Sequence, residues 1–399
     1  MAPSSPFVLR WGIISTGWIA ERVVSVSLIN YFLNNVEVRD VHDVVHKVTA
    51  VGSRSVEKAQ KFITEYVEGD KSVKAYGTYE EVYADKNVDA IYIGTPHTYH
   101  YVNALDAIRA KKHVLCEKPV TVNSAELRSL IAEAKKQGVF FMEALWTRFQ
   151  PLTLELKKLA EDGTLGAPVV VHADFSNDFG ISSMYTLCIR IDSTWLKHCQ
   201  GLPKTHRMMD PALGGGAILD LGPYPLVWAT IALYEHPSNK STKPSNITAT
   251  MYKLPATGVD CNTSYTVTFA PNPATGSTLA AQAVLSCSMN VASHSPGVTI
   301  RYEKGTIIIA APVPCPRSFT VQYFAPGKPG VVAREETRKF DYVGSGWHFQ
   351  ADEVARCVRD GKLESALWGH DKSILEMEVF DEVRRQGNYK LPDGVEKVL

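Results

Sequence analysis

The chain has 399 residues, 45% of them hydrophobic, so it is long and apolar enough to build two or three packed domains. Its 42 basic and 42 acidic side chains cancel to a formal net charge of zero, which argues against nucleic acid or an anionic membrane surface as a partner. No apolar run approaches the ~20 residues of a membrane span, and Met1–Arg10 lacks a secretory pattern, so we expect neither a membrane nor an export route.

Residues 1–150 alternate short apolar runs with helical patterns, which is typical of βαβ units and a parallel sheet. Helices are predicted from Trp18 onward and at Val56–Tyr66, Tyr99–Lys111 and Ser124–Gln137. Strands are predicted at Val8–Ser15, His46–Ser53, Ala90–Thr95, His113–Cys116 and Val139–Glu143.

After Pro151 the pattern changes to β-rich stretches separated by Pro, Gly and Asn turns. Because few long helices lie between these stretches, we expect a largely antiparallel sheet. Helices are predicted at Leu152–Asp162, Phe349–Arg359 and Lys372–Arg385. The strands are predicted at Pro168–Phe175, Ile247–Lys253, Cys261–Ala270, Ser277–Asn290, Val298–Glu303, Thr306–Ala310 and Ser318–Phe324. The sequence therefore predicts an α/β protein with domains at residues 1–150 and 151–399.

Residue types that bind metals do not cluster along the chain. The seven cysteines include no Cys-x-x-Cys pair, which favours free thiols in a reducing compartment and a cytoplasmic protein. His42 and His46 are spaced i,i+4, but no glutamate follows His42 and no third ligand is evident. We therefore expect no metal site.

The first strand–helix turn carries a dinucleotide-type loop. The fingerprint places glycines at positions 15 and 17 and a small residue at position 20. Ser15 stands at the first position, Gly17 lets the backbone approach a pyrophosphate, and Ala20 allows close helix packing. The N–H groups at the helix start suit phosphates. We expect cofactor contacts from Ser15, Thr16, Gly17, Trp18 and Ile19.

The end of the second strand indicates which cofactor binds. NAD enzymes usually place Asp or Glu there for the ribose 2′-hydroxyl, whereas this chain has Ser53 and Arg54. An arginine flanked by hydroxyls suits a 2′-phosphate through charge-assisted contacts. We therefore predict NADP.

Glu117-Lys118-Pro119 follows an apolar strand. The charge of a lysine at the end of a buried strand must be paired, or the pKa of the lysine must fall. Pro119 restricts the Lys118 backbone to extended geometry, and the bond between them can be cis. The carboxyl edge of a parallel sheet is where open α/β folds bind ligands, so Lys118 is a candidate catalytic residue.

A second candidate group follows the glycine run Gly214–Gly216. Asp220 and Tyr224 are spaced i,i+4 and share one face if the segment is helical. A lysine ammonium stabilises a phenolate, so Lys118 and Tyr224 can act as an acid/base unit. The alternative is an ordinary half-buried tyrosine with an aspartate that caps a helix.

These motifs together resemble the glucose-fructose oxidoreductase/inositol dehydrogenase/MocA family over essentially the whole chain. The resemblance rests on the N-terminal loop, Gly94–His97, Glu117–Pro119, Glu143–Phe149 and Asp220-x-Gly-x-Tyr224. Within the family, the Trp-Thr-Arg-Phe segment is most similar to fungal NADP-dependent D-xylose 1-dehydrogenases and dimeric dihydrodiol dehydrogenases.

The resemblance implies a Rossmann domain followed by an α/β domain whose open, mostly antiparallel sheet forms a homodimer interface. It implies that Lys118 lies beside the nicotinamide ribose, that Tyr224 is the general base, and that Asp220 is its polar neighbour. Further cofactor contacts are implied for Thr95, Pro96, His97, Glu117 and Lys118. Substrate contacts are implied for Trp146, Arg148, Phe175, Asp220 and Tyr224, with Asn177 and Asp178 nearby.

The implied reaction oxidises a D-xylose-like aldopyranose at C1 to the lactone by hydride transfer to NADP. Two alternatives stay open, a trans-1,2-dihydrobenzene-1,2-diol dehydrogenase and a catalytically silent NADP-binding regulator. The segment Met184–Gln200 favours the regulator, because it looks inserted shortly before Asp220, where it could block a substrate pocket. One hypothesis is that the segment is a translated, unspliced intron, which sequencing of the transcript would test.

Overall fold

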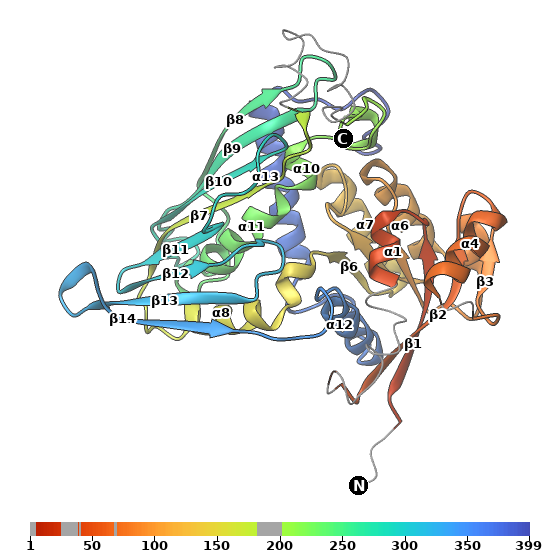
Figure 1. Cartoon of the computed structure of the whole chain (residues 1–399), viewed down its shortest axis with the longest axis horizontal. Coiled ribbons are helices and arrows are strands. Elements are labelled where there is room, and N and C mark those ends of the chain that lie inside the picture. The colour runs from red at the N-terminus through yellow and green to blue at the C-terminus, as the bar shows by residue number, and fades with distance from the viewer. Residues whose placement is uncertain (1–4, 25–38, 40, 68–69, 182–201) are drawn as a thin grey trace, which may run out of the picture. The chain divides into compact units, whose positions relative to one another are not determined.

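The computed structural model describes residues 5–24, 39, 41–67, 70–181 and 202–399 (Figure 1). The segment Met184–Gln200, interpreted above as an insertion, lies outside these residues. The chain divides into two compact units, each with its own sheet. The first unit comprises Met1–Gln150, Tyr342–Met377 and Glu396–Leu399, and the second comprises Pro151–Asp341 and Glu378–Val395.

The first unit is built on a six-stranded parallel sheet with the order β3-β2-β1-β4-β5-β6. This is the strand order of the Rossmann fold, and it reverses between β1 and β4. Strand residues such as Trp11, Ile13 and Ile91 are fully buried, as expected when helices cover both faces. The strands are β1 (Phe7–Ile14), β2 (Val44–Gly52), β3 (Lys74–Tyr76), β4 (Ala90–Ile93), β5 (His113–Glu117) and β6 (Phe141–Ala144).

Local capping signals set the limits of the helices in this unit. The helices are α1 (Trp18–Val23), α4 (Val56–Tyr66), α5 (Tyr79–Ala84), α6 (His100–Arg109) and α7 (Ser124–Gln137). The side chain of Asn123 accepts from the amide of Glu126 at the start of α7. Gly138 ends α7 in the left-handed conformation, with φ of 67°. The predicted boundaries of α4 and α7 match these helices residue for residue.

The predicted second domain, residues 151–399, needs correction, because Tyr342–Met377 and Glu396–Leu399 belong to the first unit. The cause is α12 (His348–Arg359), which packs against β1 and β2 and buries Ala351, Val354 and Ala355. An amphipathic helix joins the domain that covers its apolar face, and sequence order does not show which domain that is.

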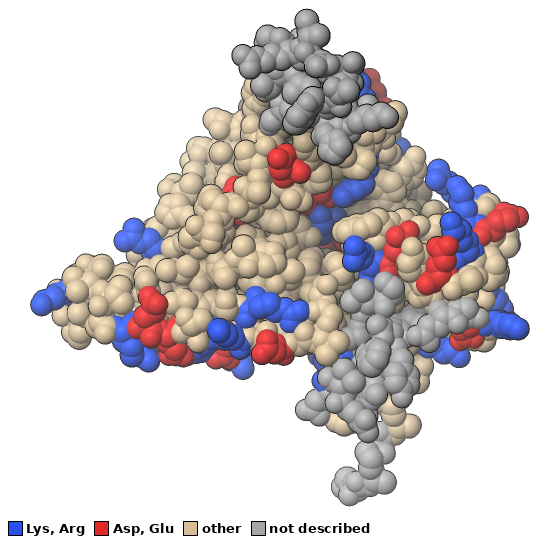
Figure 2. Space-filling model, viewed as in Figure 1, with Lys and Arg blue, Asp and Glu red and all other residues tan. Residues whose placement is uncertain are grey.

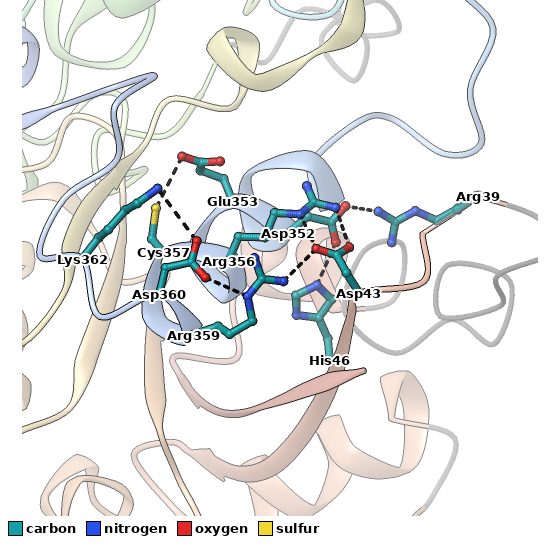
Figure 3. A network of polar contacts seen from close by, with 10 residues as sticks. All are labelled: Arg39, Asp43, His46, Asp352, Glu353, Arg356, Cys357, Arg359, Asp360 and Lys362. Atoms are coloured by element: carbon teal, nitrogen blue, oxygen red, sulfur yellow. Dashed lines mark hydrogen bonds and ion pairs between the residues drawn. The ribbon is translucent and has the colours of Figure 1, made fainter. Parts of the chain in front are cut away.

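A polar network joins α12 to the start of β2 (Figure 3). Arg356 binds Asp43 in a bidentate pair, with two N···O distances of 2.9 Å. His46 Nε2 lies 2.9 Å from Asp352 Oδ1, and Trp11 Nε1 donates to His46 Nδ1 at 3.1 Å. The imidazole that we considered as a zinc ligand therefore has both nitrogens engaged in a buried structural contact.

The second unit is built on an eight-stranded sheet with the order β14-β13-β12-β11-β7-β10-β9-β8 (Figure 1). All neighbours run antiparallel except β7 and β10, which confirms the predicted mostly antiparallel sheet. The strands are β7 (Pro168–Ser176), β8 (Asn246–Lys253), β9 (Asp260–Phe269), β10 (Ala281–Ser288), β11 (Val298–Tyr302), β12 (Gly305–Ile309), β13 (Ser318–Ala325) and β14 (Lys328–Lys339).

Three elements were not predicted from the sequence. The edge strand β14 contains six Lys, Arg and Glu residues and its side chains are mostly exposed, so it lacks an apolar pattern. Charge is common on edge strands because it discourages pairing with another chain. Strand β3 has only three residues and helix α5 only six, which is too short for a periodic signal.

The remaining helices of the second unit are α8 (Pro151–Glu161), α10 (Ala217–Asp220) and α11 (Pro223–Ala229), while α13 (His370–Gln386) begins in the first unit and ends in the second. The helical stretch Pro211–Tyr234 is long and apolar enough to cross a membrane by length and composition alone. Its apolar window is entirely buried inside the structure, as is common for core helices.

Candidate active site

The loops after β1 and β2 form the predicted nucleotide site. Ser15 adopts φ of 85°, the left-handed region in which the fingerprint places a glycine. Its hydroxyl accepts from the Gly17 amide at 3.3 Å, and Thr16 Oγ1 lies 3.1 Å from Ser53 Oγ. A Cβ placed on Gly17 would meet only Ser15 Oγ within 4 Å, so this loop is open to a ligand.

The side chains around this loop fit a dinucleotide phosphate. Gly17 is the N-cap of α1 and makes no side-chain capping bond. Trp18 is 60% exposed and Ile19 is half-buried in the first turn of α1. Ser53 is buried, whereas the Arg54 guanidinium is exposed at the end of β2. Arg54 can therefore contact a phosphate without leaving a buried partner.

His100 joins the loops that follow β4 and β5. Its Nδ1 lies 2.8 Å from the carbonyl oxygen of Pro119, and its Nε2 lies 2.8 Å from that of Thr95. Burial lowers the pKa of His100 to about 3, so the ring is neutral at physiological pH and donates one N–H. Asn103 also donates to Thr95 Oγ1, at 3.1 Å.

We predicted a helix over Tyr99–Lys111 and a cofactor contact from His97. His100 is the first residue of α6, but its ring also sets the spacing of the two loops. His97 lies just after Pro96, with its ring 5.8 Å from that of His100. The role of His100 could not be read from the sequence, since both groups next to its ring nitrogens are backbone carbonyls.

Lys118 is held between two anchored neighbours. Glu117 is buried and accepts from the Tyr92 hydroxyl at 2.7 Å. The amide of Val120 donates to Glu143 Oε1 at 3.0 Å. The Lys118–Pro119 peptide bond is cis, one of the two alternatives considered for this proline. The half-buried Lys118 side chain therefore starts from a well-fixed backbone at the carboxyl end of β5.

The Trp-Thr-Arg-Phe segment forms a 3₁₀ turn, Trp146–Phe149, directly after β6. Trp146 packs on Trp347 with ring centroids 4.8 Å apart, and the Arg148 side chain is buried. Trp347 was not predicted, because it lies in the part of the chain that we assigned to the other domain. A substrate role for Trp146 and Arg148 stays a prediction.

In the second unit, Asp220 ends α10 and Tyr224 lies in the first turn of α11. The Tyr224 ring packs edge-on against Phe175, with centroids 4.9 Å apart. Asp220 Oδ1 accepts from Arg207 Nη1 at 2.9 Å. The N-cap residues of α10 and α11, Gly216 and Gly222, make no side-chain capping bond.

The structure thus brings Phe175 and Tyr224 together, while the Asp220 carboxylate binds Arg207. Asn177 and Asp178 follow β7, where Asp178 accepts from the Gly180 amide. Lys118 belongs to the first unit and Tyr224 to the second. Their proposed cooperation in catalysis stays a prediction.

Asp260 supports the start of α10 and was missed by the sequence reading. Its carboxylate accepts from the Ile218 amide at 2.8 Å and from Thr263 Oγ1 at 2.6 Å. A Cβ on Gly216, which has φ of 109°, would collide with Asp260 Oδ1. Burial raises the pKa of Asp260 to about 6. The signal in the sequence was the glycine run. It indicates that another group lies close to the backbone there, but it does not identify that group.

Metal-binding residue types do not gather in the described parts of the chain, where no group of three His, Cys, Asp or Glu could hold an ion. Five cysteines in these parts are free thiols: Cys116, Cys261, Cys287, Cys315 and Cys357.

Comparisons with known proteins agree with this architecture. Residues 9–145 match the model of an oxidoreductase family with a NAD-binding Rossmann fold, and residues 153–308 match the GFO/IDH/MocA C-terminal domain. The chain is 34% identical to D-xylose 1-dehydrogenase (NADP(+)) of Hypocrea jecorina, over 98% of this chain and 95% of that protein. It is 32% identical to trans-1,2-dihydrobenzene-1,2-diol dehydrogenase of Danio rerio, over 95% and 96%.

Solved structures show the same fold. The crystal structure of an aldose-aldose oxidoreductase from Caulobacter crescentus, complexed with glycerol, superposes with a TM-score of 0.71. The match covers 95% of this chain and 97% of that chain at 22% sequence identity.

Proposed function

Since the chain belongs to the GFO/IDH/MocA oxidoreductase family, we propose that it is an NADP-dependent dehydrogenase that oxidises an aldopyranose such as D-xylose at C1 to the lactone. The observation that carries this proposal is the anchored lysine at the carboxyl end of β5, next to the point where the strand order reverses. The 34% identity to a D-xylose 1-dehydrogenase supports the substrate class.

The first unit offers residues for NADP in three loops. Ser15, Thr16, Gly17, Trp18 and Ile19 suit the pyrophosphate, while Ser53 and Arg54 suit the 2′-phosphate. Thr95, Pro96, His97, Glu117 and Lys118 lie at the ends of β4 and β5, where the nicotinamide end would bind. When bound, NADP supplies the hydride acceptor.

The protein residues move the proton. Tyr224, as a phenolate stabilised by the Lys118 ammonium, accepts the proton of the C1 hydroxyl while the C1 hydride leaves. The loss of one proton and one hydride takes C1 to the lactone level. Phe175 packs against the Tyr224 ring, and we assign the contacts to the sugar to Phe175, Asp220, Trp146 and Arg148.

The trans-dihydrodiol dehydrogenase activity is the second candidate, favoured by the 32% identity to such an enzyme. Both activities need the same lysine and tyrosine. A panel of aldoses and trans-dihydrodiols, assayed with NADP by absorbance of the reduced cofactor, separates them. Turnover of D-xylose but not of dihydrodiols is the expected result. Tight NADP binding without turnover of any substrate would instead indicate the silent regulator.

We also propose a cytoplasmic homodimer that pairs through the outer face of the eight-stranded sheet. Figure 2 shows few charged side chains on the broad surface over the part of this sheet from β8 to β12, whereas charged side chains gather over β13 and β14. Its strands alternate buried and exposed residues, and Tyr252 and Val284 are 57% and 39% exposed there. Sedimentation of the parent and of Val284→Glu tests the dimer, which the introduced charge should dissociate.

A further inference from the structure

Glu143 is the centre of a buried network beneath Lys118. Its Oε1 accepts from the Val120 amide at 3.0 Å, and its Oε2 accepts from Trp368 Nε1 at 3.0 Å and Ser373 Oγ at 2.6 Å. The Glu143 side chain is only 2% exposed. These three hydrogen bonds engage both oxygens of Glu143 and fix the position of its side chain.

A second buried carboxyl group meets the first. Glu376 lies on α13, three residues after Ser373, so both side chains project from the same helix face. It is 1% exposed, and within the described residues neither of its oxygens has a donor. Two carboxyl groups make a stable buried contact only when they share a proton.

The surroundings favour the proton on Glu376. Burial, and then the neighbouring Glu143, raise the pKa of Glu376 well above its usual value, while the Lys118 charge opposes this rise. Cys116, which is paired with Glu143 in register, stays a neutral thiol because burial raises its pKa. His370 on the same helix is neutral at physiological pH because burial lowers its pKa.

We propose that Glu143 and Glu376 share one proton in a buried carboxyl pair that positions Lys118. The pair carries a single negative charge near the lysine ammonium. It also fixes the Val120 amide, two residues after Lys118, while the His100 ring contacts the intervening Pro119 carbonyl. Loss of the shared proton places two negative charges in contact and disturbs the Val120 anchor.

The proposal rests on the proposed dehydrogenase activity only through Lys118, so its first test does not use activity. Infrared difference spectroscopy of the intact enzyme at neutral pH should show the carbonyl stretch of a protonated carboxylic acid. This band should disappear in Glu376→Gln and persist in the matched control Glu126→Gln. Glu126 is an equally buried carboxyl group in the same unit that accepts from the Val122 amide.

The second test uses turnover. Glu376→Gln keeps a donor to Glu143 and the single charge, so its kcat at neutral pH should stay within about threefold of the parent. Its kcat should also lose the fall that the parent shows as Glu376 ionises at alkaline pH. Glu143→Gln cannot accept all three bonds, and its kcat should fall at least tenfold while KM for NADP changes less than threefold.

Each outcome bears on the pair. A missing acid band in the parent, a band unchanged in Glu376→Gln, or parent-like kcat in Glu143→Gln would overturn the proposal. Absence of turnover in the parent would contradict the proposed function. The infrared band would still support or refute the shared proton.

Discussion

The loop that carries Lys118 and the helical run that carries Tyr224 are held in place in different ways. After Lys118, a long and flexible cation, His100 of α6 and Glu143 of β6 bind the backbone of Pro119 and Val120, and Ser373 of α13 holds Glu143. Around Tyr224, a glycine run, a buried aspartate and the Phe175 ring hold a rigid aromatic side chain. A lysine has much rotamer freedom and needs an anchored starting point, whereas a tyrosine needs mainly a packed site.

The largest effects should come from removing the two reactive groups. Lys118→Ala and Tyr224→Phe should each lower kcat by about 10³-fold, because the first removes the charge that stabilises the phenolate and the second removes the group that accepts the proton. NADP affinity, measured by quenching of tryptophan fluorescence, should remain measurable in both variants. Near-normal kcat in either variant would mean that its residue is not part of the reaction.

The glycine run should be the weak point of the Tyr224 region. Gly216→Ala should lower the free energy of unfolding by about 3 kcal/mol, because the new Cβ collides with Asp260 and φ of 109° strains an L-residue. Gly258→Ala is the matched control, with φ of 78° but no atom within 4 Å, and should cost only about 1 kcal/mol. If urea unfolding gave the same loss of free energy of unfolding for both variants, the contact with Asp260 would be unimportant.

Asp260 should make the stability of this region depend on pH. Because its pKa is raised from 3.8 to about 6, the folded state holds a proton that the unfolded state releases in this range. The contribution of Asp260 to stability should therefore fall by roughly 3 kcal/mol as the pH rises from about 4 to 6. The stability difference between the parent and Asp260→Asn, followed by urea titration, should shrink over that range. A constant difference would show that Asp260 does not titrate there.

The smallest effect is expected from a substitution at Arg54, which belongs to neither region and tests the choice of cofactor. Arg54→Ala should reduce the preference for NADP over NAD by about tenfold, since one charge-assisted phosphate contact is lost. Thermal stability should not change, because Arg54 is exposed. An unchanged ratio of the two dissociation constants would assign the 2′-phosphate to other residues.

Several site residues were predictable because their signals are local. The Gly17 loop and the lysine before Pro119 each lie within a few residues of a recognisable strand end. Glu143 was part of a recognised motif, yet its role depends on Ser373, which lies 230 residues further along the chain. Glu376 had no sequence signal, since one glutamate in a helix is ordinarily exposed.

The sequence by itself determined the α/β plan and the family resemblance, and it pointed to Lys118 and Tyr224 as candidate reactive side chains, because apolar periodicity and short motifs are local properties. Only the tertiary structure decided that Tyr342–Met377 returns to the first unit, that Asp260 meets Gly216, and that two carboxyl groups meet beneath Lys118. These depend on which distant surfaces are buried together, and burial sets both the partners and the protonation of such groups.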